Sequence, residues 1–242
     1  MILLYKYRGE TPLQALDRLR KEQPHYEKST LSYAGRLDPM AEGLLPVLVD
    51  SDNNEREKYL GLDKEYTVEV LFGIETDTGD VLGKIAKIAE PADIPQQAIE
   101  SALKKYIGTF DQEYPGYSSQ PVNGKPLYQW AREGKLDEIT IPSREVTIHS
   151  ARCEVLVTIS SEKLLALVIE DISKVQGDFR QEEIGDLWKQ YLLHKTRTFF
   201  IARITIACSS GTYMRVLAQN LGKDLNCGAI AYSIKRTKIA TC

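Results

Sequence analysis

Residues 34–46 read AGRLDPMAEGLLP and combine one carboxylate with a proline and two glycines at the start of an apolar run. Pro39 disfavours helical backbone in the residue before it, so Asp38 is expected to be extended. Gly35 and Gly43 allow a tight bend or the close approach of a ligand. Two explanations remain open from these residues alone: a carboxylate held rigidly at the edge of a pocket, or an Asp-Pro pair that only caps a turn.

The same stretch resembles the signature of the TruB family of tRNA pseudouridine synthases, which reads G-x-L-D-P-x-A-x-G-x-L-P. A match over the whole of such a pattern is far more specific than a single Asp-Pro pair. The fixed positions of the pattern are all met, by Gly35, Leu37, Asp38, Pro39, Ala41, Gly43, Leu45 and Pro46.

Three further segments resemble parts of this family and follow in the family's order. Residues 64–78 are similar to its K-x-Y strand and T-x-T turn, and residues 122–134 to the insertion with which it grips RNA. Residues 208–222 are similar to the C-S-x-G-T-Y-x-R start of a helix. Together the resemblance covers about residues 3–135 and 199–239.

The resemblance implies an isomerase that converts a uridine in the T-loop of tRNA, at the position numbered 55, into pseudouridine. That uridine must be flipped out of the folded RNA before it can react. By the resemblance, Asp38 is the carboxylate that acts at the ribose, and Arg215 is its partner. Tyr66 is the ring that stacks on the target base and a candidate to take its C5 proton. Nothing is oxidised and no group is donated, so neither a cofactor nor a metal is expected.

Each of these roles has a simpler alternative in the residues themselves. Arg215 could contact phosphate, and Tyr66 could be an ordinary half-buried strand tyrosine. Tyr33 stands where the family usually has a histidine, five residues before the aspartate; its ring can still stack on a base, or it can pack under the loop. Lys64 is expected to be a structural or backbone-contacting residue, and Ile234 to line the pocket or lie in the core. The expected RNA-contacting set is Tyr33, Arg36, Lys64, Asn123, Lys125, Tyr128, Arg132, Tyr213, Ile234 and Arg236.

The chain departs from the family pattern in several places. The insertion motif P-P-x-Y-S-A-x-K reads YPGYSSQP at residues 114–121, so that Pro121 replaces its lysine. The N-terminal motif K-P-x-G-x-T-S is only partly kept at residues 6–12, and residues 171–198 have no counterpart. Because the chain ends at Cys242, the RNA-binding domain that many relatives carry after the catalytic core is expected to be absent.

The predicted elements favour an α+β fold, because helices and strands do not alternate one by one. The resemblance implies the pseudouridine synthase fold, a mixed, mostly antiparallel central sheet flanked by helices. Residues 1–242 are expected to form a single catalytic domain. It would contain the RNA-gripping insertion at about 111–144 and the unmatched insertion at about 171–198.

Individual elements follow from periodicity and punctuation. Strands are predicted over residues 65–72, 146–159, 164–169, 199–207 and 229–239, and a short one after the loop at 29–50. A helix is predicted from Pro12 to just before Pro24, with a Thr11/Gln14 capping box and an apolar stripe of Leu13, Leu16 and Leu19. Further helices are predicted over 94–107, 127–133, 178–193 and 211–225. Asp178–Gln181 reads as a second capping box, and 111–126 as irregular.

Composition excludes several classes of protein. The 242 residues are 43% hydrophobic and 27% charged, as in a soluble globular protein. The apolar runs at 44–49 and 164–169 are far shorter than the roughly 20 residues of a membrane helix. At the N-terminus the charged residues follow a very short apolar stretch, whereas in a signal peptide they precede a longer one. A cytoplasmic protein without a membrane partner is therefore expected. Four cysteines without a CxxC pair and three scattered histidines do not indicate zinc. A monomer is expected.

The charge is distributed unevenly. Residues 195–242 carry eight basic groups against Asp224 alone, whereas residues 50–113 carry 7 basic and 15 acidic groups. A polyanion responds to the local field rather than to the net charge of −3. The C-terminal fifth is therefore either a surface that faces phosphates or a set of charges that balances the acidic middle.

Two other functions compete with the leading one. A non-catalytic RNA-binding protein or tRNA folding chaperone would fit the Tyr33 substitution and the altered insertion, but would not need Asp38, Tyr66 and Arg215 together. A pseudouridine synthase acting on another RNA is a further alternative. A carboxylate-dependent glycoside hydrolase would need a second acid, for which Glu42 is the nearest candidate.

Overall fold

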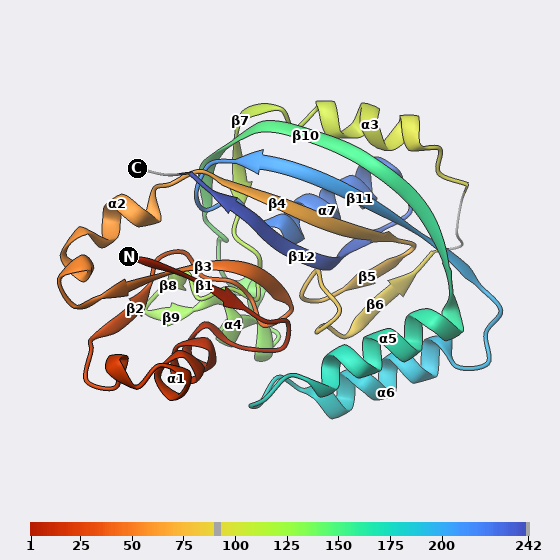
Figure 1. Cartoon of the computed structure of the whole chain (residues 1–242). Coiled ribbons are helices and arrows are strands. Elements are labelled where there is room, and N and C mark those ends of the chain that lie inside the picture. Colours follow the sequence, from red (N-terminus) through yellow and green to blue (C-terminus); the bar gives the residue numbers. More distant parts are fainter. Residues whose placement is uncertain (90–92, 241–242) are drawn as a thin grey trace.

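A mixed eight-stranded sheet forms the centre of the computed structural model, which describes residues 1–89 and 93–240 (Figure 1). All neighbouring strands in it are antiparallel except β12 and β3, which are parallel. Across the sheet the order is β1 (Ile2–Lys6), β3 (Ala41–Val49), β12 (Ala229–Ile239), β4 (Lys64–Phe72), β11 (Thr198–Cys208), β10 (Ser143–Ser160) and β7 (Gly108–Glu113), with β2 (Leu31–Tyr33) paired to β3. The expected α+β fold with a mostly antiparallel sheet is confirmed.

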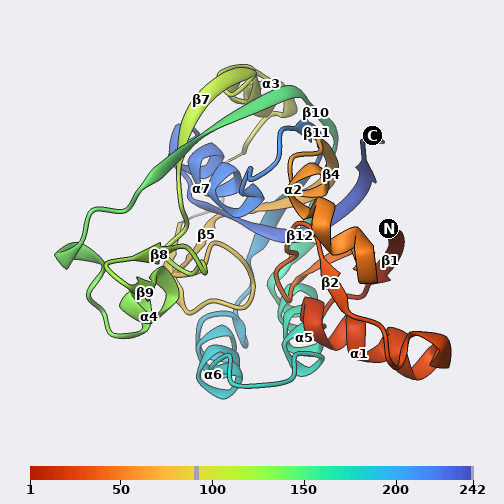
Figure 2. The same ribbon diagram turned by 90° about the vertical axis from the view of Figure 1, so that its left-hand side faces the viewer.

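Helices lie on both sides of this sheet, and two small hairpins extend from it (Figures 1 and 2). The hairpins are β5 (Ile74–Thr76) with β6 (Ile85–Ile88), and β8 (Pro121–Val122) with β9 (Lys125–Pro126). The α-helices are α1 (Pro12–Glu22), α2 (Arg56–Leu60), α3 (Gln96–Lys104), α4 (Leu127–Arg132), α5 (Ser161–Ser173), α6 (Gln181–Leu192) and α7 (Met214–Asp224). Short 3₁₀ turns are η1 (Pro24–Tyr26), η2 (Asp50–Glu55) and η3 (Leu136–Glu138).

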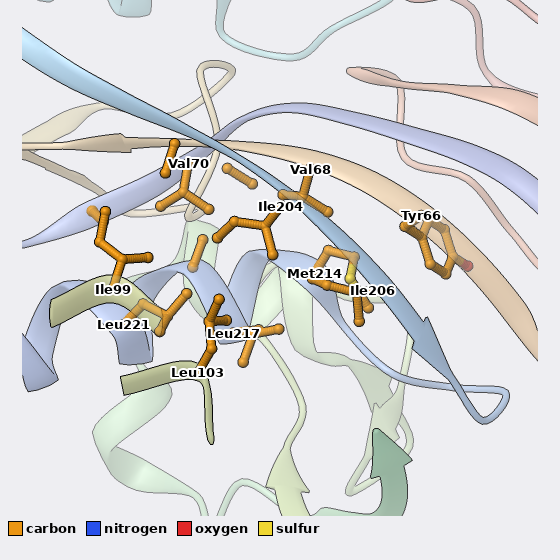
Figure 3. Close-up of a cluster of buried hydrophobic side chains, with 14 of the residues drawn as sticks. Tyr66, Val68, Val70, Ile99, Leu103, Ile204, Ile206, Met214, Leu217 and Leu221 are labelled. Atoms are coloured by element: carbon orange, nitrogen blue, oxygen red, sulfur yellow. The ribbon is translucent and has the colours of Figure 1, made fainter. Parts of the chain in front are cut away.

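The core has two main layers, because alternate residues of a strand point to opposite faces of the sheet. On one face, Tyr66, Val68 and Val70 of β4 pack with α3 and α7 (Figure 3). On the other face, Leu71 of the same strand packs with α5, α6 and the β5–β6 hairpin, around the fully buried Trp188. The central strands are thus covered on both sides, which fixes the ends of β4 and β3 in place.

The signature stretch leads into β3, which is longer than the short strand predicted and begins at Ala41. Gly43 has φ +110°, and a Cβ atom there would lie 2.3 Å from the Arg236 backbone oxygen of β12. Arg236 is the register partner of Gly43 in the parallel pairing. The second glycine of the signature is therefore required by the close approach of two strands.

One predicted strand is wrong. Residues 164–169 lie within helix α5. Ser160 caps the start of this helix, because its hydroxyl accepts a hydrogen bond from the Lys163 backbone N–H at 3.3 Å. The buried positions Leu164, Leu165, Val168 and Ile172 have helical spacing. A short apolar run cannot by itself be assigned to a buried helix or a strand.

Other differences are local. Residues 111–113 belong to β7 rather than to an irregular segment, and Leu13 is 63% exposed instead of joining the α1 stripe. The capping box at Asp178 does not form, and α6 begins at Gln181 after Arg180, whose φ is +63°. The Thr11/Gln14 capping box of α1 is confirmed. Cys153, Cys208 and Cys227 are buried free thiols, and Cys242 lies outside the described residues.

Candidate active site

Asp38 and Arg215 form an ion pair, although 177 positions separate them in the sequence. Arg215 Nε donates to Asp38 Oδ2 at 2.8 Å. The Arg215 side chain, in the first turn of α7, is only 4% exposed, whereas that of Asp38, just before β3, is 32% exposed. The cation is thus embedded in the protein and the carboxylate remains reachable from outside.

Two backbone carbonyls hold the other nitrogens of the Arg215 guanidinium. One terminal nitrogen donates to the Thr78 oxygen at 2.6 Å and the other to the Tyr117 oxygen at 3.1 Å. With all three nitrogens bonded, the planar guanidinium has one orientation, which aims Nε at Asp38.

Asp80 is a second anion beside Arg215 that the sequence analysis missed. Its Oδ2 lies 3.8 Å from Arg215 Nε, and its Oδ1 accepts hydrogen bonds from Thr78 Oγ1 and the Leu82 N–H. Burial raises the pKa of the Asp80 carboxyl, against the opposing effect of Arg215. Burial alone would lower the pKa of Arg215, but the charges of Asp38 and Asp80 outweigh it and the pKa is raised. Its position two residues after the T-x-T turn is the one feature of the sequence that could have marked Asp80 as a site residue.

Tyr66 lies on β4 at the edge of the core, with its hydroxyl directed away from the aliphatic side chains (Figure 3). It is 8% exposed. Burial raises the pKa of its phenol; nearby Arg236 lowers it and the Asp38 charge raises it, with a net increase. Ile234 of β12 is the register partner of both Val68 in β4 and Ala41 in β3, and it is buried. The signature, the K-x-Y strand and β12 therefore meet at one end of the sheet.

Two buried cations hold the signature stretch from opposite sides. Arg236 donates to the Leu44 and Gly35 oxygens at 2.6 and 3.1 Å. Lys6 Nζ donates to the Ala41 and Pro39 oxygens at 2.6 and 3.2 Å, and burial lowers the pKa of Lys6 to about 8. Arg236 is 1% exposed and bonds to the signature backbone, which is a structural role, and its expected contact with RNA stays a prediction.

Lys64 likewise contacts backbone, as one of its expected alternatives proposed. Its ammonium donates to the Leu60 oxygen at 2.9 Å and to the Leu62 oxygen, and burial lowers its pKa to about 8. The side chain is inside the protein, with the residue 5% exposed. It ties the end of α2 to the start of β4.

Most of the remaining candidates lie in two regions, the signature side and the insertion, whereas Tyr213 is half-buried just before α7. Tyr33 and Arg36 are neighbours on the signature side, with a 3.3 Å hydrogen bond from Arg36 to the Tyr33 hydroxyl. Asn123 sits at the β8–β9 turn with φ +50°. Lys125 pairs with Glu133 at 2.6 Å and lies 3.7 Å from the centre of the Trp130 ring.

Tyr128, Arg132 and Tyr213 complete the predicted set. Tyr128 is 39% exposed on α4, and Arg132 bonds to Asp178. Tyr213 precedes α7, where its backbone is held by Gln112. Figure 2 shows β8, β9 and α4 extending away from the central sheet. Their contact with RNA remains a prediction.

Arg144 is another residue that sequence reasoning missed. It lies on β10 opposite Gln112, and its buried Nε has no hydrogen-bond partner among the described residues. A Cβ atom at Gly211 would lie 2.1 Å from the Arg144 guanidinium carbon, so this glycine makes room for the arginine. Only strand pairing brings the two together, and no local pattern could have indicated it.

The basic C-terminal fifth is largely paired with acidic groups from earlier in the chain. Arg203 bonds to Glu69 at 2.9 Å and Lys238 to Glu65 at 3.0 Å, across neighbouring strands. Lys235 lies 3.9 Å from Glu42. Together with Arg215, four of the eight basic residues pair with acidic groups, and Arg236 bonds to backbone oxygens instead. The pairing favours charge balance over a continuous phosphate-binding surface.

The fold matches that of solved pseudouridine synthase complexes. The chain superimposes on a Cbf5-Nop10-Gar1 complex with a TM-score of 0.58 and 15% identity, covering 98% of this chain and 48% of that one. A structure of an H/ACA RNP bound to a substrate RNA containing 2'-deoxyuridine gives 0.53 and 14%, covering 98% and 47%. At these identities the likeness establishes the fold alone: the chain has the pseudouridine synthase fold.

Sequence comparison places the chain more narrowly. The N-terminal domain of TruB family pseudouridylate synthases matches residues 23–165, and the chain belongs to this family. It is 33% identical over 239 residues to tRNA pseudouridine synthase B of Aromatoleum aromaticum, covering 99% of this chain and 62% of the relative. The protein of the same name from Syntrophus aciditrophicus is 31% identical over 207 residues, covering 85% and 52%. The chain thus spans about half to two thirds of the length of these curated relatives.

The described residues contain neither a metal-binding cluster nor a helix that could span a membrane. No cluster of three or more His, Cys, Asp or Glu side chains within 1–89 and 93–240 is arranged to hold a metal ion. Over the same residues, no helix has the length and hydrophobicity needed to cross a bilayer.

Proposed function

We propose that this chain is a tRNA pseudouridine synthase that isomerises the T-loop uridine at tRNA position 55. The observation that carries the proposal is the reachable Asp38 carboxylate fixed by the buried Arg215, within the signature of the family. The names of the relatives, all tRNA pseudouridine synthase B, support tRNA as the substrate class.

The proposed reaction is an isomerisation and conserves all atoms. The bond between ribose C1′ and N1 of uracil breaks, the base turns, and a bond from C1′ to C5 forms. C5 loses its proton and N1 ends with one. Asp38 is placed to act at the ribose or at the base ring as nucleophile or as the negative charge that stabilises the transition state. Arg215 fixes its direction.

Tyr66 fits the role of a stacking surface better than that of a base. Burial raises the pKa of its phenol, so the hydroxyl keeps its proton near neutral pH. We therefore propose that Tyr66 packs against the flipped uracil together with Ile234, and that the C5 proton leaves to another acceptor. Packing of the detached base against these two side chains would also keep water from it.

RNA would reach this site between two exposed regions. Tyr33 and Arg36 flank the signature on one side, and the insertion at about 111–144 lies on the other. We propose that residues 1–242 act as a single catalytic domain in which both regions contact the T-arm, and that the protein works as a monomer in the cytoplasm.

The test is position-resolved mapping of pseudouridine in an unmodified tRNA transcript incubated with the purified chain. The expected product is pseudouridine at position 55, and none in a transcript that carries cytidine there. Pseudouridine only in other RNA fragments would replace tRNA as the substrate. Tight tRNA binding without any pseudouridine would favour the RNA-binding or chaperone alternative.

A further inference from the structure

The helical hairpin of α5 and α6 holds most of residues 171–198, the insertion that is expected to have no counterpart in the family pattern. Its connecting loop ends at Arg180 and lies against two segments of the candidate site region. Arg132 of α4 donates to the side chain and backbone oxygen of Asp178 in this loop at 3.1 and 2.7 Å. The hairpin therefore contacts the RNA-gripping insertion directly.

Arg180 makes the central contacts. One of its terminal nitrogens donates to Asp77 Oδ2 at 2.7 Å and to the Tyr117 hydroxyl at 2.8 Å. Its guanidinium carbon lies 4.5 Å from the centre of the Tyr117 ring, and Tyr117 donates to the same Asp77 oxygen at 3.0 Å. Arginine, tyrosine and aspartate thus form a closed triangle in which each member contacts the other two.

This triangle joins the two segments that hold Arg215. Tyr117 itself supplies the carbonyl that accepts from one terminal nitrogen of Arg215, and Thr78, next to Asp77, supplies the other. Nothing in the sequence near either segment sets their distance in space, because Asp77 and Tyr117 are 40 residues apart in the chain. Arg180 ties both side chains from outside and so fixes the spacing between the two carbonyls.

The ion pair between Arg180 and Asp77 is partly shielded from solvent. The side chains of Arg180 and Asp77 are 16% and 28% exposed, well below a typical surface pair, so solvent weakens the interaction less. Arg180 keeps a left-handed backbone, which disfavours a non-glycine residue and is sustained here by the side-chain contacts.

We propose that Arg180 is a positioning residue for the Asp38–Arg215 pair, acting through Asp77 and Tyr117, and that the unmatched helical hairpin braces the catalytic centre. The inference rests on the proposed function for its kinetic consequence only. Without Arg180, the direct hydrogen bond from Tyr117 to Asp77 remains but the second link between the two segments is lost, so the Tyr117 carbonyl that orients Arg215 is held less firmly.

The experiment compares Arg180→Ala with Arg180→Lys, and with Lys189→Ala as a control that removes an exposed positive charge from the same hairpin. Saturating enzyme and tRNA transcript give the single-turnover rate, and steady-state kinetics separate kcat from KM. Arg180→Ala is expected to lower the rate and kcat by about 10- to 100-fold with KM within about threefold, because the chemical step depends on orientation. Arg180→Lys should recover part of the loss, since an ammonium keeps the charge but not the fork.

Hydrogen exchange provides a readout that needs no activity. In Arg180→Ala, peptides covering residues 76–80 and 115–119 should exchange faster than in the wild type, while those of α1 and Lys189→Ala throughout should not change. Unchanged exchange in both segments, or a single-turnover rate within twofold of the wild type, would overturn the proposal. If the wild type makes no pseudouridine, the proposed function fails, and the exchange result alone decides whether the brace exists.

Discussion

At the scale of single residues, the site is a buried arginine that lies beside two aspartates, one partly exposed and the other buried. Arg215 bonds to Asp38, which is partly exposed, and lies near Asp80, which is buried. A buried guanidinium without an anion would be strongly destabilising. Asp80 can therefore serve as a second counter-charge that keeps Arg215 paired when Asp38 engages a substrate.

Lys6 gives a prediction for the pH dependence of stability. Burial lowers its pKa in the folded protein to about 8 from 10.5. Between these values the unfolded chain binds more protons than the folded one, so the contribution of Lys6 to stability rises with pH. The shift corresponds to about 3 kcal/mol over that window.

We expect Lys6→Met to remove this part of the rise. Urea unfolding at about pH 7 and about pH 10 measures it, with the wild type gaining more stability than the variant between the two conditions. The Lys64 pKa is also lowered to about 8, so the variant should retain a smaller rise rather than none. An equal gain in both proteins would show that Lys6 is not desolvated as described.

A site residue could be identified from the sequence only where it lies within a family motif. Asp38, Tyr66 and Arg215 were found from family patterns, and the ion pair confirms that the first and last meet. Burial was not predictable, since Arg236 looks like a surface base in sequence yet is enclosed by the signature loop. Arg180 has no motif at all, because its partners come from two distant segments.

At the scale of elements, the parallel pairing of β3 with β12 holds the signature against the sheet. A Cβ atom at Gly43 would lie 2.3 Å from the Arg236 oxygen and 2.8 Å from its nitrogen. Gly108 has nearly the same φ, +108°, with nothing within 4 Å of its would-be Cβ atom. An alanine at position 43 would meet both a steric clash and an unfavourable φ, whereas an alanine at position 108 would meet the unfavourable φ alone.

We expect Gly43→Ala to cost at least about 3 kcal/mol of unfolding free energy, because the strands must separate. Gly108→Ala should cost about 1 to 2 kcal/mol, for backbone strain alone. Denaturant unfolding of both variants measures the difference. Equal losses would mean that β3 and β12 do not approach as closely as described.

The elements themselves were predictable where period and punctuation agreed. The strands at 65–72, 199–207 and 229–239 match β4, β11 and β12 within a residue or so, since each is apolar, β-branched and bounded by turns. The error at 164–169 arose because these six residues are all apolar, so the helical period that the exposed Glu162, Lys163 and Glu170 give to the whole of α5 is not visible within them. The brace between α6 and the insertion depends on tertiary contacts, which no local pattern encodes.

At the scale of the whole molecule, much of the basic charge of residues 195–242 is paired with acidic groups, at the surface as well as in the core. Basic groups of β11 and β12 face acidic groups of β4 and β3, as in Arg203 with Glu69 and Lys238 with Glu65. Arg215 and Arg236 are buried. The net charge of this stretch therefore overstates the unpaired positive charge that it can offer to phosphates.

This arrangement predicts a shallow salt dependence of tRNA binding. If all eight basic residues of the C-terminal fifth contacted phosphate, the slope of log affinity against log salt would be about −7. We expect a magnitude of about 4 or less. Titrations of labelled tRNA at several salt concentrations measure it, and a slope near −7 would restore the phosphate-facing surface.

The most direct test of the central claim is pseudouridine formation by Asp38→Asn, with Asp17→Asn as a matched control on an exposed face of α1. Asp80 remains beside Arg215 in the variant, so the protein is expected to fold and to bind tRNA within about threefold of the wild type. The account predicts that pseudouridine at position 55 falls to background in Asp38→Asn and is unchanged in Asp17→Asn. Pseudouridine formed by Asp38→Asn at the wild-type rate would contradict it.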